Sequence, residues 1–370
     1  MEKIKRNFGF GCMRLPMQGE EVDLAQTKQM VDEFLAQGFN YFDTAHGYIG
    51  GRSETALRTC LTSRYPRESY VLTDKLSGGF FETEADIRPF FARQLAACGV
   101  DYFDFYLMHS QNAENFQQFK ACRAYETAFD LKAEGKIRHV GLSFHDRAEV
   151  LDRILTEYPQ IEVVQIQFNY LDYDDIAVQS RKCYEVCRRH NKPVLVMEPV
   201  KGGSLAGMNN EIQGIMKAQN PDLSIPSWAV RFCAGLDNIL TVLSGMSTKA
   251  QLDDNVSYME HFEPLSDKEH EVLKTVVEKL NAISTIPCTG CRYCVDDCPM
   301  QIHIPDIFRA VNRQKQFGSE DNVDRSGYES ATREGGKASE CLHCGSCEAH
   351  CPQHIHIIEE LEDAAKLFEG

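Results

Sequence analysis

Eight of the fifteen cysteines occur near the C-terminus in two copies of one spacing pattern. The pattern is C-x2-C-x2-C-x3-C followed by proline, and it runs from Cys288 to Pro299 and again from Cys341 to Pro352. Three thiolates at two-residue spacing wrap a loop around one small volume, whereas a fourth before proline points elsewhere. We therefore predict two 4Fe-4S clusters. Their expected ligands are Cys288, Cys291, Cys294, Cys298, Cys341, Cys344, Cys347 and Cys351.

The duplication also indicates how the fourth ligands are shared. In two-cluster ferredoxins the cysteine before proline ligates the other cluster. Under that rule Cys351 joins the first three cysteines of the first motif, and Cys298 joins the first three of the second. Zinc also accepts four cysteines, but zinc sites seldom combine two consecutive x2 gaps with x3 and proline. Iron and sulfur are therefore the preferred interpretation.

The other seven cysteines are scattered without metal-ligand neighbours, and we expect them to be buried free thiols. They are Cys12, Cys60, Cys98, Cys122, Cys183, Cys187 and Cys233. The N-terminal segment MEKIKRNFGFGCMRLP lacks the apolar run of about 7–15 residues that a secretory signal requires. A cytoplasmic location is expected, and its reducing conditions disfavour disulfides.

Charge and hydropathy exclude two classes of partner. The formal net charge of −16 opposes binding to phosphate backbones and to anionic lipid surfaces. No window approaches the roughly 18 uninterrupted apolar residues of a membrane span. We expect neither nucleic acid nor a membrane as a partner.

Short runs rich in Val, Ile, Phe and Tyr alternate with segments of helical period, which is typical of a parallel sheet covered by helices. Eight such runs predict a closed (β/α)8 TIM barrel, an α/β fold, over residues 1–283. A small, mainly helical 4Fe-4S ferredoxin-like domain is expected over residues 284–370. The predicted strands cover residues 9–15, 41–45, 70–75, 104–109, 138–144, 163–169, 193–200 and 239–245.

Three neighbouring strands end in polar residues. The second runs into Asp43 and on to Tyr48, the third ends at Lys75, and the fourth ends at His109. In a β/α barrel the chemistry lies at the C-terminal ends of the strands, so these side chains should converge on one pocket. An ion pair of Asp43 with Lys75 and a core histidine at 109 would be the purely structural alternative.

These segments carry a resemblance to the aldo/keto reductases. It rests on FDTAHGYIGGRSE from Phe42, TDK ending at Lys75, YLMH ending at His109 and GLSFHD from Gly141, and it covers roughly residues 1 to 265. The resemblance implies nicotinamide-dependent reduction of a carbonyl or oxidation of an alcohol. Tyr48 would be the general acid or base. Lys75 would lower its pKa, Asp43 would orient the lysine, and His109 would orient the substrate carbonyl.

The resemblance also implies contacts to the cofactor. Ser143 and Gln165 match the positions that hold the nicotinamide amide, although Phe144 follows where asparagine is usual. At the adenine ribose end the matching residues are Ser244, Gly245, Gln251 and Asn255. Many relatives carry Lys and Arg where Gly245 and Gln251 stand, so the preference for NADP(H) over NAD(H) is weakened, with Lys249 as a substitute cation.

Four further polar residues near the same strand ends are assigned no role, because residues in such places are usually solvated. They are His46, Asp74, His145 and Glu198. The sequence thus favours an oxidoreductase acting on a small carbonyl or alcohol. The alternative is an electron-transfer or redox-sensing subunit whose clusters serve a redox partner protein.

Overall fold

The protein is described by a computed structural model covering residues 1, 3–176, 178–288, 290–296, 298–318 and 323–370. The chain forms two compact units, and each is described by itself. The first comprises Met1–Gly202 and Pro226–Ser266, and the second comprises Gly203–Ile225 and Asp267–Gly370. Among the described residues, no helix has the length and apolar character needed to cross a bilayer.

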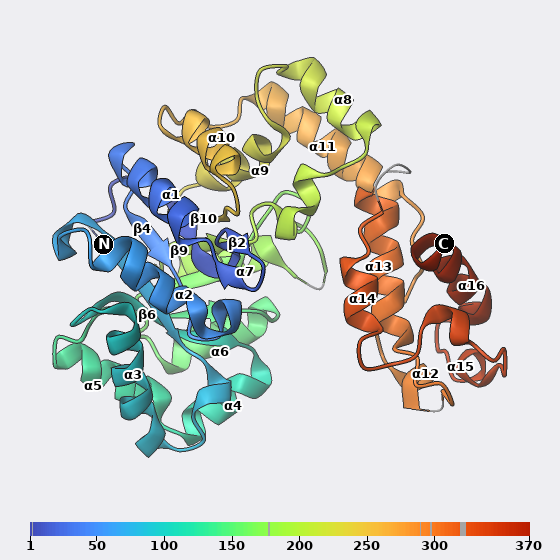
Figure 1. Cartoon of the computed structure of the whole chain (residues 1–370), viewed down its shortest axis with the longest axis horizontal. Helices are drawn as coiled ribbons and strands as arrows, with labels where there is room; N and C mark the ends of the chain where they lie inside the picture. The colour runs from blue at the N-terminus through green and yellow to red at the C-terminus, as the bar shows by residue number, and fades with distance from the viewer. Residues whose placement is uncertain (2, 177, 289, 297, 319–322) are drawn as a thin grey trace. The chain divides into compact units, whose positions relative to one another are not determined.

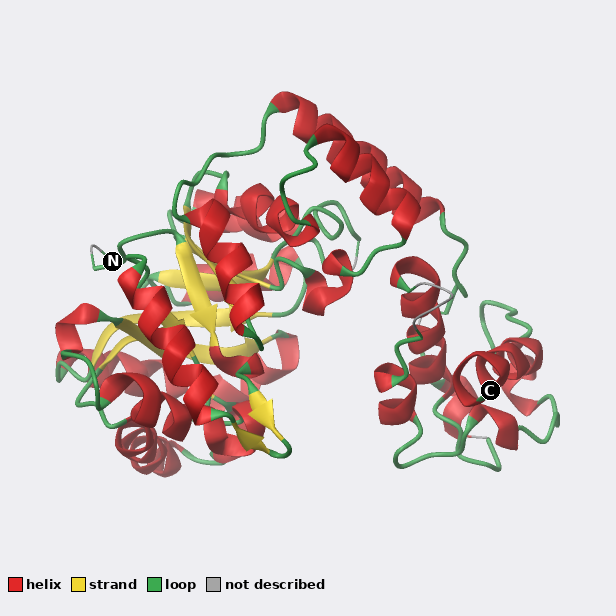
Figure 2. Ribbon diagram, turned by 45° about the horizontal axis from the view of Figure 1, so that its top comes forward, coloured by secondary structure: helices red, strands yellow, loops and turns green. Residues whose placement is uncertain are grey.

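Eight parallel strands close into a barrel in the first unit, in the order β1-β10-β9-β8-β7-β6-β5-β4 (Figure 1, Figure 2). This confirms the predicted (β/α)8 fold. The strands are β1 Phe8–Gly11, β4 Tyr41–Asp43, β5 Val71–Leu76, β6 Phe103–Gln111, β7 Ile137–Phe144, β8 Val163–Gln167, β9 Val194–Met197 and β10 Ile239–Gly245. A hairpin of β2 Met17–Gln18 and β3 Glu21–Val22 lies outside the barrel.

The barrel wall depends on close packing of side chains between neighbouring strands. Gly141 on β7 is paired with Val163 on β8, and a Cβ at Gly141 would lie 2.5 Å from the Val163 side chain. Only glycine permits this approach of the two strands. Val163 also packs with Tyr41, Phe105 and Leu195 in one buried apolar cluster inside the unit.

Helices surround the barrel, as Figure 2 shows in red around the yellow strands. They are α1 Leu24–Ala36, α2 Arg52–Leu57, α3 Glu84–Cys98, α4 Ala113–Ala121, α5 Ala124–Ala133, α6 Ala148–Glu157, α7 Ser180–Arg189, α9 Ile225–Ala234 and α10 Lys249–Met259. The first strand is shorter than predicted. After Gly11 the chain turns in a 3-10 segment, Cys12–Arg14, instead of continuing as a strand to Leu15.

The second unit is helical among its described residues, apart from one bridge between Ile302 and Gly336. Its helices are α8 Asn210–Gln219, α11 Asp267–Ala282, α12 Tyr293–Asp296, α13 Ile304–Phe317, α14 Ser326–Ala331, α15 Ser346–Ala349 and α16 Ile357–Glu369. Ile307 and Phe308 of α13 and Leu361 of α16 share one buried core with Cys294 and Cys347. The predicted mainly helical tail is confirmed.

Candidate functional site

The centre of the candidate active site is a buried ion pair. Asp43 ends β4 and Lys75 lies near the end of β5, so adjacent parallel strands bring the two side chains together. Lys75 Nζ is 2.5 Å from Asp43 Oδ1 and donates to the Thr44 carbonyl at 2.8 Å. Burial, the largest single effect, would lower the pKa of Lys75, but the charge of Asp43, the neighbouring Tyr48 and hydrogen bonds to both together outweigh it, and the pKa is raised. The lysine is therefore a permanent cation.

Tyr48 lies beside this cation, in a turn of unusual backbone geometry. Lys75 Nζ is 4.9 Å from the centroid of the Tyr48 ring. The three residues after Tyr48 adopt left-handed φ angles of 54° at Ile49, 60° at Gly50 and 85° at Gly51. Such a conformation is rare for a β-branched residue, so the surrounding structure must hold Ile49 in place.

The pKa of Tyr48 reflects two opposing effects. Burial raises it, and the charge of Lys75 lowers it. The effect of Lys75 has the expected direction, but burial is larger, so the net pKa is raised above its usual value. The phenol is therefore protonated at neutral pH, which is the state a general acid requires.

His109 faces the same phenol from β6. Its ring centroid is 6.0 Å from that of Tyr48, and its Nδ1 is 2.6 Å from Ser77 Oγ. Burial, and then the positive charge of Lys75, lowers the pKa of His109 to about 3. Ser77 was not singled out from the sequence, because its proximity to His109 depends on the neighbouring strand. The structure thus brings together all four predicted catalytic residues: Asp43, Tyr48, Lys75 and His109.

We expect kcat/KM for carbonyl reduction to show no ionisation near the ordinary histidine pKa of about 6.5. The reason is that His109, with its pKa of about 3, is neutral throughout the usual assay range. The measurement is kcat/KM against pH for the wild type and for His109→Gln. An ionisation near pH 6.5 that disappears in the variant would show that His109 is charged in the free enzyme.

The two residues expected at the nicotinamide lie at the ends of β7 and β8. Ser143 and Gln165 are both buried, and they are paired in register. Gln165 Nε2 donates to Asp43 Oδ2 at 3.1 Å, and Ser143 Oγ accepts from the Ser110 backbone N–H at 2.8 Å. Gln165 therefore connects this pair directly to the Asp43–Lys75 ion pair.

The residues expected at the adenine end lie around the end of β10 and the start of α10. Asn255 Nδ2 donates to Ser244 Oγ at 3.1 Å, and Gln251 Oε1 accepts from the Ser247 N–H at 2.7 Å. Lys249 is exposed, and its ammonium contacts both carboxylate oxygens of Asp253, at 2.6 and 2.7 Å. Lys249 is therefore already paired within its own helix.

Arg14, which the sequence analysis did not single out, lies against Gly245. A Cβ at Gly245 would be 3.2 Å from Arg14 Cδ. Among the described residues, no hydrogen bond or ion pair involves the Arg14 guanidinium. Because β1 and β10 pair in register at Gly11 and Gly245, the loop after β1 brings a cation to the end of β10.

One expectation about solvated residues is wrong. Asp74 was expected to be a solvated loop residue, but it is fully buried. It precedes Lys75 within β5, and its carboxyl group faces Glu54 of α2. His145, by contrast, is exposed as expected.

In the second unit, the two cysteine motifs line two separate cavities. The first cavity is lined by Cys288, Cys291, Cys294 and Cys351. The second is lined by Cys298, Cys341, Cys344 and Cys347. Each cavity thus receives the cysteine before proline from the other motif. All fifteen cysteines are free thiols, and the seven outside the motifs are buried.

The surroundings of the cavities suit iron–sulfur clusters. Ile304 lines both cavities, and apolar residues make up most of the remaining lining, with Arg292, His350 and Gln353 at the first cavity and Ser346 at the second. Four free thiols around an apolar pocket form a donor set that soft iron–sulfur groups accept.

Comparisons with known proteins agree with this architecture. The aldo/keto reductase family model matches residues 7–278, and a 4Fe-4S dicluster domain model matches residues 287–356. This chain belongs to the aldo/keto reductase family and carries a 4Fe-4S dicluster domain at its C-terminus. The predicted boundary near residue 283 stays a prediction.

Individual relatives are distant. The NADH-specific methylglyoxal reductase of Escherichia coli is 24% identical over 66% of this chain and 85% of its own length. An aldo-keto reductase from Bacillus halodurans in its holo form is 24% identical with a TM-score of 0.57, covering 73% of this chain and 91% of that one. An aldo-keto reductase from Klebsiella pneumoniae in complex with NADPH is 17% identical with a TM-score of 0.58, covering 73% and 90%.

Proposed function

We propose that this protein is a nicotinamide-dependent oxidoreductase that reduces a carbonyl group or oxidises an alcohol, fused to a domain that carries two 4Fe-4S clusters. The arrangement of Tyr48 beside the buried Asp43–Lys75 pair is the observation that carries the proposal. A protonated phenol next to a fixed cation, with a neutral imidazole opposite, suits proton transfer to a carbonyl oxygen.

Each side chain has a defined task in this proposal. A bound reduced nicotinamide would supply the hydride. Tyr48 gives its proton to the carbonyl oxygen, and Lys75 stabilises the phenolate that this leaves. A His109 Nδ1 that accepts from Ser77 keeps the ring proton on Nε2, which can then donate to the same oxygen. Ser143 and Gln165 orient the cofactor amide.

Carbonyl-dependent oxidation of NADPH or NADH by the anaerobically purified protein tests the proposal. An α-oxoaldehyde such as methylglyoxal is a suitable first substrate, because a relative carries that activity in its name. We expect nicotinamide oxidation that depends on the carbonyl compound. If neither cofactor is oxidised with any aldehyde, ketone or dicarbonyl of a broad panel, the proposed reaction is wrong.

The cofactor's phosphate end gives a second expected outcome. Relatives with cations at positions 245 and 251 have bidentate partners for a 2′-phosphate, and Gln251 is an exposed amide here. We expect Gln251→Arg to tighten NADPH binding by about tenfold, the effect of roughly one charged hydrogen bond. Fluorescence titration measures this. NADH, which lacks that phosphate, serves as the control ligand, and equal tightening for both would contradict the explanation.

The dicluster domain supports a second candidate, an electron-transfer or redox-sensing subunit. A hydride carries two electrons together, whereas each cluster would accept one. A group such as a flavin, which takes a hydride and releases single electrons, would be needed to convert between the two. We therefore expect NADPH alone to leave cluster absorption unchanged in an anaerobic titration. Bleaching of the clusters by NADPH would favour the electron-transfer subunit.

A further inference from the structure

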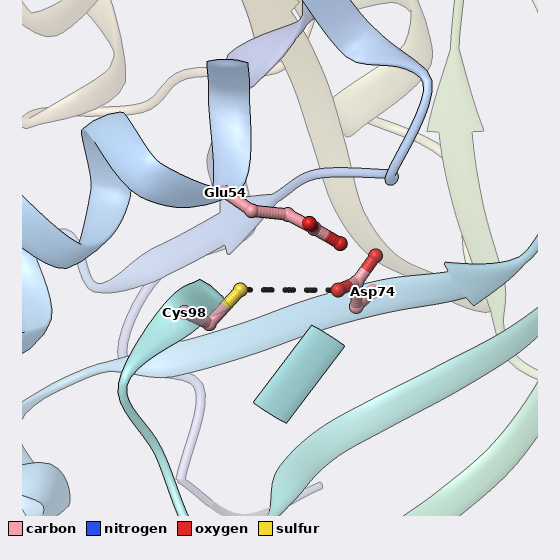
Figure 3. Close-up of side chains that lie close together, drawn as sticks. All are labelled: Glu54, Asp74 and Cys98. Atoms are coloured by element: carbon pink, nitrogen blue, oxygen red, sulfur yellow. Dashed lines mark hydrogen bonds between the residues drawn. The ribbon is translucent and has the colours of Figure 1, made fainter. Parts of the chain in front are cut away.

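A buried group of side chains next to the main chain of Lys75 has no role in the mechanism proposed above. Glu54 of α2 and Asp74 of β5 point their carboxyl groups toward each other, and Cys98 at the end of α3 lies beside them (Figure 3). Both carboxyl groups are fully buried. Two carboxylates this close in a buried site cannot both ionise, so one proton must lie between them.

The geometry indicates which residue keeps the proton. Burial raises the pKa of both carboxyl groups, and the charge of Glu54 raises that of Asp74 further, to well above its usual range. Glu54 also accepts from Gln94 Nε2 at 3.3 Å and faces His46 Nδ1 at 2.8 Å. As a carboxylate, Glu54 offers both oxygens as acceptors to Gln94, to Asp74 and to the Nδ1-protonated tautomer of His46, whereas a protonated Glu54 would use one oxygen as a donor. Asp74 is therefore the donor and Glu54 the charged acceptor.

Two partners of Glu54 bind the main chain of Lys75. Asp74 Oδ1 accepts from the Lys75 backbone N–H at 2.8 Å, and Gln94 Nε2 donates to the Lys75 carbonyl at 3.0 Å. Tyr106 hydroxyl in turn donates to Gln94 Oε1 at 2.5 Å, which fixes the orientation of that amide. Both polar groups of the Lys75 peptide are thus held by side chains that contact Glu54.

The third partner of Glu54 belongs to the loop that carries Tyr48. His46 precedes Tyr48 by two residues, and its ring packs edge-on against Phe80 and Phe90, which stack on each other. Thr44 Oγ1 and Ser53 Oγ, 2.7 Å apart, close the same loop at its base. The loop contains the left-handed residues after Tyr48. The His46–Glu54 contact and the Thr44–Ser53 hydrogen bond therefore keep a strained turn in one conformation.

We propose that Glu54 and protonated Asp74 form a positioning unit that fixes Lys75 relative to Tyr48. Glu54 connects the loop of the proton donor to the peptide of the lysine that stabilises it. The proposal rests on the proposed catalytic roles of Tyr48 and Lys75, and it involves no metal ion. The titratable and polar groups that face the pair are His46, Lys75, Gln94, Cys98 and Tyr106, and Arg93 acts on His46 through its charge.

Matched substitutions test the unit. Asp74→Asn keeps a neutral donor toward Glu54 and an acceptor for the Lys75 N–H, so kcat should stay within about twofold of wild type. Asp74→Ala removes both hydrogen bonds. Glu54→Gln replaces a carboxylate oxygen by an NH2 group, which faces the donors that Glu54 accepts from. Each variant should therefore lower kcat by about tenfold or more. The Kd for NADPH, measured by fluorescence titration, should be unchanged in all three.

Infrared spectroscopy gives a readout that does not depend on turnover. The wild type should show the carbonyl stretch of a buried protonated carboxylic acid at neutral pH, and Asp74→Asn should lack it. Asp104→Asn is the control, because Asp104 is also buried but is paired with Arg67 and Lys3. This variant should keep the band and the rate profile, whatever its stability.

Each outcome decides the matter. Absence of the infrared band overturns the shared proton, even if Glu54→Gln fails to fold. Equal loss of kcat in Asp74→Asn and Asp74→Ala, or no loss in Asp74→Ala and Glu54→Gln, overturns the positioning role. Failure of the proposed function is distinguishable, because Tyr48→Phe would then keep full activity while the infrared result still stands by itself.

Discussion

Replacing Tyr48 by phenylalanine is expected to lower kcat for carbonyl reduction by about 10²- to 10⁴-fold, the usual contribution of a positioned general acid. The substitution removes one hydroxyl and leaves the ring beside Lys75 and His109. The substitution therefore removes the proton that the proposed mechanism transfers to the carbonyl oxygen, and it leaves Lys75 with no phenolate to stabilise. Steady-state kinetics with a saturating carbonyl substrate measures the loss.

Cofactor binding and the iron content should not change in Tyr48→Phe, because the residues expected to carry them lie elsewhere. A matched control is Tyr65→Phe, since the Tyr65 hydroxyl donates to Asp32 instead of facing Lys75. The control should retain wild-type turnover. Undiminished carbonyl reduction in Tyr48→Phe would remove Tyr48 from the reaction and favour the electron-transfer subunit.

The sequence was most informative where spacing along the chain determines what side chains meet. The strand predicted over residues 239–245 has those bounds in β10, because the run ILTVL is rich in apolar and β-branched residues and a glycine follows shortly after it. The exchange of Cys298 and Cys351 between cavities also followed from the motif, because proline turns the fourth cysteine away from its own loop. Both are local patterns that physical chemistry converts directly into geometry.

The sequence was least informative about properties that depend on burial, such as the pKa and the solvent exposure of a side chain. Lys75 was expected to lower the pKa of Tyr48, and it does so, but the larger effect of burial could not be read from neighbouring residue types. Asp74 was assigned to solvent because polar residues after strands usually are solvated. Its burial depends on Glu54 and Gln94, which come from two different helices. Contacts between such distant segments leave no periodic signal in one sequence.

Replacing Cys344 by serine is expected to lower the iron content by about half, from about eight atoms per chain to about four. Cys344 lines the second cavity with Cys298, Cys341 and Cys347, so only that cluster should be affected. Iron analysis of anaerobically purified protein measures the loss, and zinc analysis of the same samples tests the alternative metal. Iron content equal to the wild type would remove Cys344 from the ligand set.

Two further variants make this prediction specific. Cys298→Ser should cause the same loss as Cys344→Ser, although Cys298 belongs to the first motif, because it lines the second cavity. Combining the two substitutions should then remove no more iron than either alone. Cys122→Ser, which changes a thiol of the barrel unit, should keep all the iron. An additive loss in the double variant would instead assign Cys298 to the cluster of its own motif.

Loss of one cluster should also change the thermal unfolding of the second unit. Three cysteines of each cavity lie in or against the core that contains Ile307, Phe308 and Leu361, so a missing cluster leaves part of that core without support. Bound metal contributes directly to the folding of metal-binding domains. We therefore expect the second unit to unfold at a lower temperature in Cys344→Ser, while carbonyl reduction by the barrel persists. This combination would show that the clusters stabilise the second unit without taking part in hydride transfer.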